Sequence, residues 1–179
     1  MLGAGTVVLS LQNGVDNAAR LSSVIGRAVV PAVVFVGTGM AGPGHVKHHG
    51  GGSLLIGAGP QSEAMAALLA AADIPTTVSA DIAAALWSKL IINCAWNALS
   101  AIANLSYGAI IEIGGARELV ADIVAECVAV ARHEGVTLPD DMLEQGLKLS
   151  AMMPGQVSST AQDLKRGKPT EVDFLNGHI

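Results

Sequence analysis

A line of polar side chains along one predicted helix is the part of this sequence that could do chemistry. The stretch from Trp87 to Tyr107, WSKLIINCAWNALSAIANLSY, predicts a long helix. At about 100° per residue, its polar side chains fall within an arc of about 80°, and most of the remaining helix surface is apolar. We therefore expect the stripe to face a cleft. Its members are Lys89, Asn93, Asn97, Ser100 and Asn104.

This polar stripe has two interpretations. Lysine and asparagine on a helix commonly form its solvated face, and their spacing alone is compatible with that. A solvated face usually carries several charges, however, whereas this stripe carries Lys89 and no carboxylate. A buried cation and buried amides need polar partners, and a ligand could supply some of them. The composition of the stripe therefore favours a site for a neutral or anionic polar ligand.

A second polar region lies near the end of the sequence. The stretch SSTAQDLKRGKPTEVDFLNG places Ser158 and Ser159 at the start of one predicted helix and Glu171 at the start of the next. Backbone N–H groups and hydroxyls at a helix start favour a carboxylate ligand. In the alternative, which the sequence alone favours, Ser158 is a plain N-cap and Glu171 is a plain first-turn acid.

Two glycine-rich stretches imitate a dinucleotide-binding loop. Residues 37–42, GTGMAG, match G-x-G-x-x-G, but Pro43 and a second predicted strand follow where a helix would have to begin. Residues 54–64, LLIGAGPQSEA, run from strand to helix but lack the third glycine and carry Pro60. We therefore predict a glycine-rich hairpin for the first stretch and a strand-to-helix turn capped by Ser62 for the second.

The histidines and cysteines of the sequence predict no metal site. In a strand, His45 and His49 share one face and His48 points to the other, with no carboxylate or thiolate nearby. Cys94 and Cys127 lie in apolar helical surroundings. We predict that they are reduced core thiols and form neither a disulfide nor a metal pair.

The composition is more apolar than that of most soluble domains. Of 179 residues, 51% are hydrophobic and 14% are charged, with mean hydropathy +0.50, which implies a large core or an oligomer interface. Prolines, glycines and polar residues interrupt the apolar stretches and the start of the chain lacks a basic segment, so we expect no membrane span, no signal peptide and a cytoplasmic location. A net charge of −5 and a pI near 5.4 argue against a nucleic-acid partner.

The predicted elements run from strands at the start to helices afterwards. This order predicts either an α+β fold or the end of an α/β domain joined to a helical one, with the boundary near residue 80, between residues 1–80 and 81–179. Strands are expected at 6–11, in a pair broken or bent at Pro31, at 45–49, at 53–57 and at 75–80, with helices at 15–26 and 62–74. Further helices are expected at 115–135, 139–153 and 157–167, and from residue 170.

Three of these stretches together resemble the ketopantoate reductase (2-dehydropantoate 2-reductase) family. They are LQNG at 11–14, WSKLIINCAWNALSAI from Trp87, and SSTAQDLKRGKPTEVDFLNG from Ser158. The resemblance implies the end of a Rossmann-type domain with a β-hairpin, followed by an all-α C-terminal domain of the 6-phosphogluconate dehydrogenase C-terminal-like type. It also implies NADPH-dependent reduction of 2-dehydropantoate to (R)-pantoate, on the route to pantothenate and coenzyme A.

The resemblance assigns the catalytic step to two residues. It implies that Lys89 binds the ketone oxygen and donates its proton as hydride arrives, and that Glu171 pairs with this lysine and with the substrate hydroxyl. An ammonium beside the carbonyl would both stabilise the negative charge that hydride transfer builds on oxygen and supply the proton.

The resemblance assigns binding roles to four further residues. It implies that Asn93 and Asn97 bind the substrate and that Ser159 holds the substrate carboxylate. Asn13 would lie between the nicotinamide of NADPH and the substrate.

Two departures from the family pattern bear on these expectations. Tyr107 stands where many relatives have a further asparagine, which leaves open a related reductase of another branched 2-keto acid. The family's glycine-rich NADPH loop has no counterpart here, so we expect an incomplete enzyme that is inactive alone. Alanine-rich helices of low charge would suit a homodimer, and a helical dimerisation module without activity is the alternative from another class.

Overall fold

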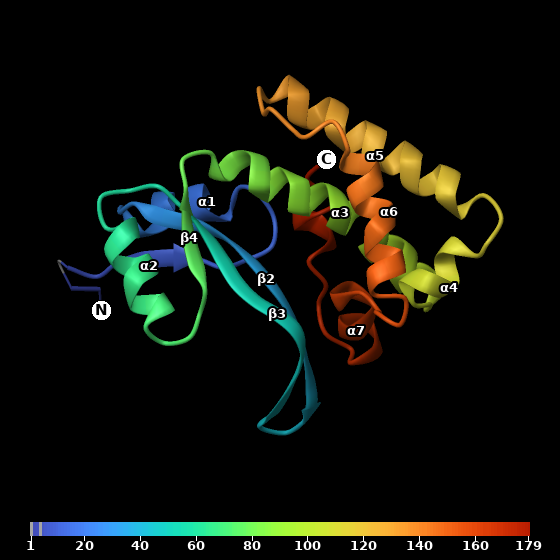
Figure 1. Ribbon diagram of the computed structural model, residues 1–179, viewed down its shortest axis with the longest axis horizontal. Coiled ribbons are helices and arrows are strands. Elements are labelled where there is room, and N and C mark those ends of the chain that lie inside the picture. The colour runs from blue at the N-terminus through green and yellow to red at the C-terminus, as the bar shows by residue number, and fades with distance from the viewer. Residues whose placement is uncertain (1, 4) are drawn as a thin grey trace. The chain divides into compact units, whose positions relative to one another are not determined.

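Two compact units make up the chain, one of residues 1–86 and the other of residues 87–179. The computed structural model in Figure 1 describes residues 2, 3 and 5–179, and at His49 it describes the backbone only. The strands all belong to the first unit, and the regular elements of the second unit are all helical. The expected order, an α/β remnant followed by an all-α part, is confirmed.

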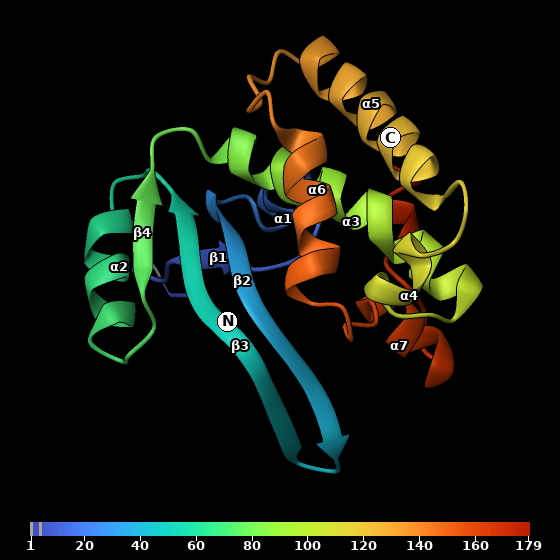
Figure 2. The ribbon, with the colours of Figure 1, turned by 45° about the vertical axis from the view of Figure 1, so that its right-hand side comes forward.

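The first unit is built on a mixed four-stranded sheet in the order β1-β2-β3-β4. The β1–β2 and β3–β4 pairs are parallel, and β2 and β3 form an antiparallel hairpin. Parallel neighbours need a crossover, which α1 and α2 provide; Figure 2 shows α2 beside β4. The bounds are β1 (Val8–Ser10), α1 (Asn17–Ile25), β2 (Val29–Gly42), β3 (His45–Gly57), α2 (Ser62–Ala70) and β4 (Thr76–Ser79).

The core of the first unit lies between this sheet and α2. Ala32 of β2 and Leu54 and Ile56 of β3 are buried together with Ala66 of α2. Leu69, Ile74 and Val78 are among the partly buried side chains packed against them. This small apolar cluster is what holds the crossover helix on the strands.

The β2–β3 hairpin is longer and more continuous than the sequence predicted. Of the predicted break or bend at Pro31, the break was wrong: β2 continues through Pro31, because the antiparallel pairing with β3 begins only at the next residue, Ala32. Likewise the stretches 45–49 and 53–57 belong to one strand, β3. The register shifts between Phe35 and Val36, where a Cβ on Gly51 would collide with the Phe35 carbonyl. Residues 37–42 form part of this hairpin, as predicted.

The turn from β3 into α2 has a different hydrogen bond from the one predicted. Gln61, and not Ser62, occupies the N-cap position of α2. The Ser62 side chain is buried, and its hydroxyl donates to the Gly57 carbonyl at 2.7 Å. The hydroxyl therefore ties the end of the strand to the helix start, and the predicted capping role was wrong.

The long polar-striped helix is α3 (Ile82–Ala103), whose residues 87–103 belong to the second unit. It begins and ends earlier than the predicted stretch from Trp87 to Tyr107. Asn104 has φ 53°, in the left-handed region that commonly ends a helix, so it does not share the helix face. The polar stripe therefore consists of Lys89, Asn93, Asn97 and Ser100.

By length and composition alone, α3 also qualifies as a helix that could cross a membrane. The side chains of Leu90, Ile91, Cys94 and Ala95 are at most 1% exposed, because the rest of the second unit covers them. The apolar character of α3 is thus explained by its place in a protein core.

The remaining helices of the second unit follow α3 in the chain. Trp96 of α3 is fully buried, and its Nε1 donates to the Gly146 carbonyl of α6 at 2.9 Å. Its ring also tilts against Tyr107 of α4, with centroids 5.1 Å apart. The bounds are α4 (Tyr107–Ile111), α5 (Ala116–His133), α6 (Met142–Met152), α7 (Ser159–Lys165) and the 3-10 turn η1 (Val172–Phe174).

Three side chains singled out in the sequence lie in the core of the second unit. Cys94 and Cys127 are buried free thiols, as predicted. Their mutual hydrogen bond and their burial raise the pKa of the Cys94 thiol, which keeps it protonated. Tyr107 is 6% exposed, and burial raises its pKa to about 12. The tyrosine is therefore part of the packing around Trp96.

The close approach of α4 to the end of α6 predicts a cost for added volume. A Cβ on Gly108 would lie 2.8 Å from Pro154 Cβ and 2.9 Å from the Pro154 carbonyl oxygen, whereas one on Gly155 meets nothing within 4 Å. We expect Gly108→Ala to lower the free energy of unfolding by about 1–3 kcal/mol. Gly155→Ala is the matched control and should change it by less than about 0.5 kcal/mol. Chemical denaturation measures both, and equal midpoints for the two variants would contradict the prediction.

Candidate active site

Lys89 is the only cation on α3, and its environment is unusual for a lysine. The next two residues, Leu90 and Ile91, are fully buried, so the helix surface beside the lysine is covered by protein. Partial burial lowers the pKa of Lys89, and the negative charge of Glu171 counteracts part of this shift. The ammonium is therefore half-desolvated and acted on by a carboxylate, as a proton donor in a site would be.

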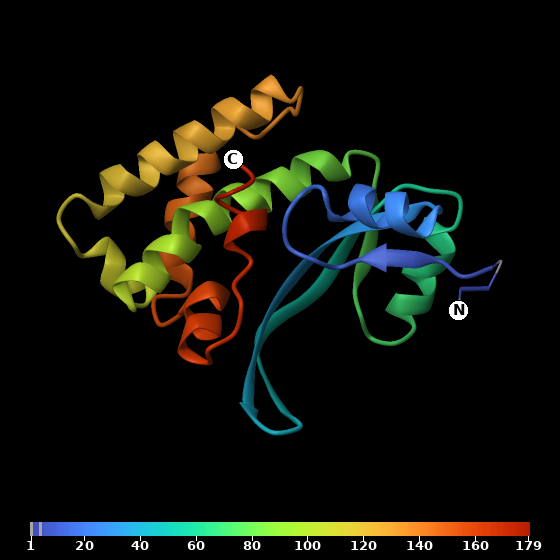
Figure 3. The same cartoon turned by 180° about the vertical axis from the view of Figure 1, so that it is seen from behind.

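Glu171 reaches this lysine because the C-terminal segment returns to α3, as Figure 3 shows from behind. Glu171 lies at the N-cap position of η1, and not in the first turn of an α-helix as predicted. Beyond it, Leu175 is 1% exposed, and the Asn176 amide donates to the Cys94 carbonyl of α3 at 3.1 Å. The His178 ring lies 5.9 Å from that of Trp87.

The two asparagines of the stripe follow Lys89 along α3. Asn93 is half-buried, and Asn97 is 3% exposed. The main-chain carbonyl of Asn97 accepts a hydrogen bond of 3.2 Å from the Ser158 hydroxyl. The helix thus holds the lysine and both amides on one face, and the second amide lies next to the start of α7.

The serine pair at the start of α7 divides into a buried and an exposed residue. Ser158 is 1% exposed and caps the helix, because its Oγ accepts from the Ala161 N–H at 3.1 Å. Its own N–H donates to the Ser100 hydroxyl at 3.1 Å. Ser159, at the first position of the helix, is exposed. The interpretation of Ser158 as a plain N-cap is confirmed, and Ser159 is the serine that can meet a ligand.

Ser100 completes this internal network. Its side chain is fully buried, and its hydroxyl donates to the Leu105 carbonyl at 2.7 Å while it accepts from Ser158. Both hydrogen-bonding directions of the hydroxyl are therefore used within the protein. Ser100 belongs to the structural part of the stripe, whereas Lys89 and Asn93, nearer the start of α3, are half-buried and can meet a ligand.

Asn13 belongs to the first unit. It follows the carboxyl end of β1 and is half-buried, and its main-chain carbonyl accepts from the Asn17 amide at 2.6 Å. Ligands of open α/β sheets bind at the carboxyl ends of parallel strands. The position is therefore suitable for a cofactor contact.

Two hollows on the second unit lie elsewhere. A hollow of about 720 Å³ is lined by residues of α5 and α6, including Arg117, Glu144 and Lys148, and one of about 490 Å³ lies between α4, α5 and α6. Lys148 and Glu144 form an exposed ion pair at 2.8 Å there, which is typical of a solvated surface. The perturbed lysine and its carboxylate are a stronger indication of a site than either hollow.

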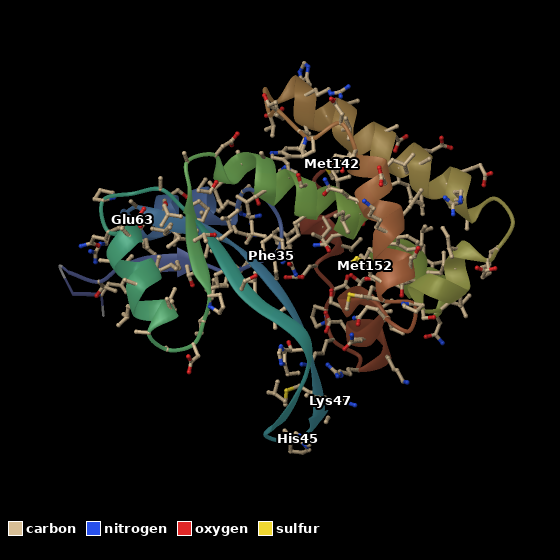
Figure 4. All side chains as sticks on the ribbon, in the orientation of Figure 1. Phe35, His45, Lys47, Glu63, Met142 and Met152 are labelled. Atoms are coloured by element: carbon tan, nitrogen blue, oxygen red, sulfur yellow. The ribbon has the colours of Figure 1, made fainter. Side chains whose placement is uncertain are left out.

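His45 and His48, near the hairpin tip, are surface residues. Figure 4 places His45 and Lys47 at the far end of the hairpin, and both are exposed. His48 Nε2 lies 3.1 Å from the Gly51 carbonyl. Within the described residues, no group of three or more His, Cys, Asp or Glu side chains is placed to hold a metal ion.

The sequence interpretation missed Asn176. It lies in FLNG, where an asparagine before a glycine suggests only a turn. Its partner, the Cys94 carbonyl, is 82 positions away, and a main-chain acceptor leaves no mark in the side-chain pattern. No local signal could have revealed this contact.

Comparison with known proteins gives a consistent result over the whole chain. The family model described as "Ketopantoate reductase PanE/ApbA C terminal" matches residues 81–179, and the model "Ketopantoate reductase PanE/ApbA" matches residues 1–61. The 2-dehydropantoate 2-reductase of Halobacterium salinarum is 37% identical over 186 residues, covering 98% of this chain and 60% of the relative. That of Caulobacter vibrioides is 35% identical over 181 residues, covering 100% and 62%.

A solved structure agrees with these matches. The PanE/ApbA family ketopantoate reductase of Ralstonia eutropha JMP134 has a TM-score of 0.94 and 51% identity, covering 99% of this chain and 59% of that one. The chain thus spans about three fifths of the length of the relatives it matches. On these grounds the chain belongs to the ketopantoate reductase family.

Proposed function

We propose that the protein takes part in the NADPH-dependent reduction of 2-dehydropantoate to (R)-pantoate, a step of pantothenate and coenzyme A biosynthesis. Residues 81–179 would form the substrate-binding and catalytic domain, and residues 1–80 the last part of the dinucleotide-binding domain. The proposal is carried by the half-buried Lys89 ammonium with the carboxylate of Glu171 acting on it. The relatives named 2-dehydropantoate 2-reductase support the choice of substrate.

In the proposed reaction, Lys89 is the general acid. Bound NADPH supplies the hydride to the ketone carbon, and Asn13 is the residue of this chain that we assign to the cofactor. As negative charge grows on the ketone oxygen, the Lys89 ammonium stabilises it and transfers a proton to it. A lowered pKa makes the ammonium a stronger acid, which favours this transfer. The negative charge of Glu171 offsets part of this lowering.

The remaining assigned residues bind and orient the substrate. Asn93 and Asn97 can donate hydrogen bonds from the same helix face as the lysine. Ser159 offers an exposed hydroxyl at the start of α7 for the substrate carboxylate. A keto acid held at its carboxylate and its ketone would have the reacting carbon at a defined distance from Lys89.

The choice of substrate is tested by following NADPH oxidation in the full-length protein. We expect 2-dehydropantoate to be turned over with a higher kcat/KM than other branched 2-keto acids, because the side chain of Tyr107 packs in the core. A higher kcat/KM for another 2-keto acid would favour the related reductase. Absence of turnover with every 2-keto acid, in a protein that purifies as a tight dimer, would favour the helical dimerisation module.

The role of Lys89 predicts a large loss of turnover. We expect Lys89→Ala to lower kcat by about 10²- to 10⁴-fold, because the ketone oxygen loses its proton donor. The free energy of unfolding should not fall, because a half-buried charge is removed. Lys148→Ala, which removes an exposed lysine of α6, is the matched control and should leave kcat unchanged. Steady-state kinetics decides, and equal kcat values for the two variants would remove Lys89 from the mechanism.

Substitution by alanine is expected to affect stability at Ser158 and substrate binding at Ser159. Ser158→Ala loses a buried cap and should lower the free energy of unfolding by about 1–2 kcal/mol. Ser159→Ala should leave stability unchanged but raise KM for the keto acid by about 10- to 100-fold, because a hydrogen bond to a charged carboxylate is lost. Denaturation and steady-state kinetics on both variants measure the two effects. An unchanged KM in Ser159→Ala would mean that another residue binds the carboxylate of the keto acid.

A further inference from the structure

We infer that Asn176 is a positioning residue, whose side-chain amide holds the segment that carries Glu171 against the helix that carries Lys89. The effect of Asn176 on catalysis rests on the proposed function. Its structural content, the placement of one charged group beside another, can be tested without any turnover.

The contact that carries this inference joins two distant parts of the chain. Asn176 Nδ2 donates to the main-chain carbonyl of Cys94 at 3.1 Å, across 82 positions of sequence. Cys94 is 0% exposed and directly follows Asn93 on α3. On the other side of the contact, Asn176 follows η1, whose N-cap position is Glu171. The hydrogen bond therefore links the neighbourhoods of both members of the Lys89–Glu171 pair.

This hydrogen bond supplies a directional restraint on the C-terminal segment. Burial of Leu175 holds the segment close to the core, but apolar burial is non-directional. The tilted rings of His178 and Trp87, whose centroids are 5.9 Å apart, also allow the segment to shift along α3. A carbonyl has a second lone pair, so the Cys94 oxygen can accept the amide without giving up its helical hydrogen bond. The amide thus sets the position of the segment along α3.

The position of this segment matters for the lysine because the attraction between two charges falls with their separation. The titratable side chains of residues 171–179 are those of Glu171, Asp173 and His178, and the chain tested also carries the α-carboxylate of Ile179. The charge that acts on the Lys89 ammonium is that of Glu171. Loss of the Asn176 restraint would therefore weaken the attraction between Glu171 and the Lys89 ammonium.

The direct test is a titration of lysine side chains in the 179-residue chain by NMR. We expect Asn176→Leu, which keeps the branched shape but removes the donor, to weaken proton binding at Lys89 by about threefold to tenfold. Lys47, Lys148, Lys165 and Lys168 are exposed and serve as internal references that should not move. Asn176→Gln retains an amide donor and should restore part of the proton affinity. If Asn176→Leu does not fold, Asn176→Ser, which shortens the donor's reach, replaces it.

The matched control is Trp96→Phe. This substitution also removes a hydrogen bond from a side chain to a main-chain carbonyl, the one from Trp96 to Gly146, between two helices of the same unit. It should lower stability while leaving the Lys89 titration unchanged. An unchanged Lys89 titration in Asn176→Leu would overturn the inference. So would an equal shift in Trp96→Phe, because the effect would then follow from loss of stability alone.

Kinetics of the full-length protein separates this inference from the proposed function. Lys89 must be protonated to act as an acid, so kcat/KM should decline at a lower pH in Asn176→Leu than in the parent, by the shift seen in the titration. If no 2-keto acid is reduced but the Lys89 titration moves as expected, the proposed function fails and the positioning role stands. If the parent is active and the Lys89 titration does not move, the positioning role alone fails.

Discussion

The partial burial of the Lys89 ammonium is the constraint on which the arrangement of the candidate site in the second unit depends. Lys89 sits on a helix whose neighbouring side chains are fully buried, and desolvation of a cation is unfavourable unless an opposite charge is near. Glu171 supplies that charge from a segment at the other end of the unit. The second unit must therefore bring the C-terminal segment back to α3, and this return is what assembles the candidate site.

The contacts along α3 separate structural from reactive groups. At the far end of the polar stripe, Ser100 and Ser158 form hydrogen bonds with each other and with main-chain carbonyls nearby. Their polar atoms therefore serve the folded structure. Nearer the start of the helix, Lys89 and Asn93 are only half-buried. Adjacent serines show the same division, since Ser158 is buried as a cap while Ser159 is exposed. A polar stripe on a buried helix can thus combine a structural half with a half that binds a ligand.

The errors of the sequence interpretation have physical reasons. Asn104 fits the helical period, but it adopts the left-handed conformation that ends α3. The periodicity of the sequence does not show where a helix ends in this way. Pro31 suggested a break in a strand, yet the antiparallel pairing with β3 begins only after it. Ser62 looked like a cap because it precedes a helical pattern, but its hydroxyl faces back to Gly57. In each case a backbone conformation or a hydrogen bond overrode a local preference.

By itself the sequence determined which residues share a helix face, because that depends only on the 3.6-residue period. Lys89, Asn93 and Asn97 could therefore be placed together, and the family resemblance could be recognised from short motifs. The tertiary structure decided which of these groups meet Glu171, which are buried, and that Asn176 binds the Cys94 carbonyl. Such contacts join positions far apart in the chain, either by hydrogen bonds to main-chain carbonyls or by burial that excludes water from the side chains. They come into existence only when the segment folds back onto α3, so no stretch of sequence contains them.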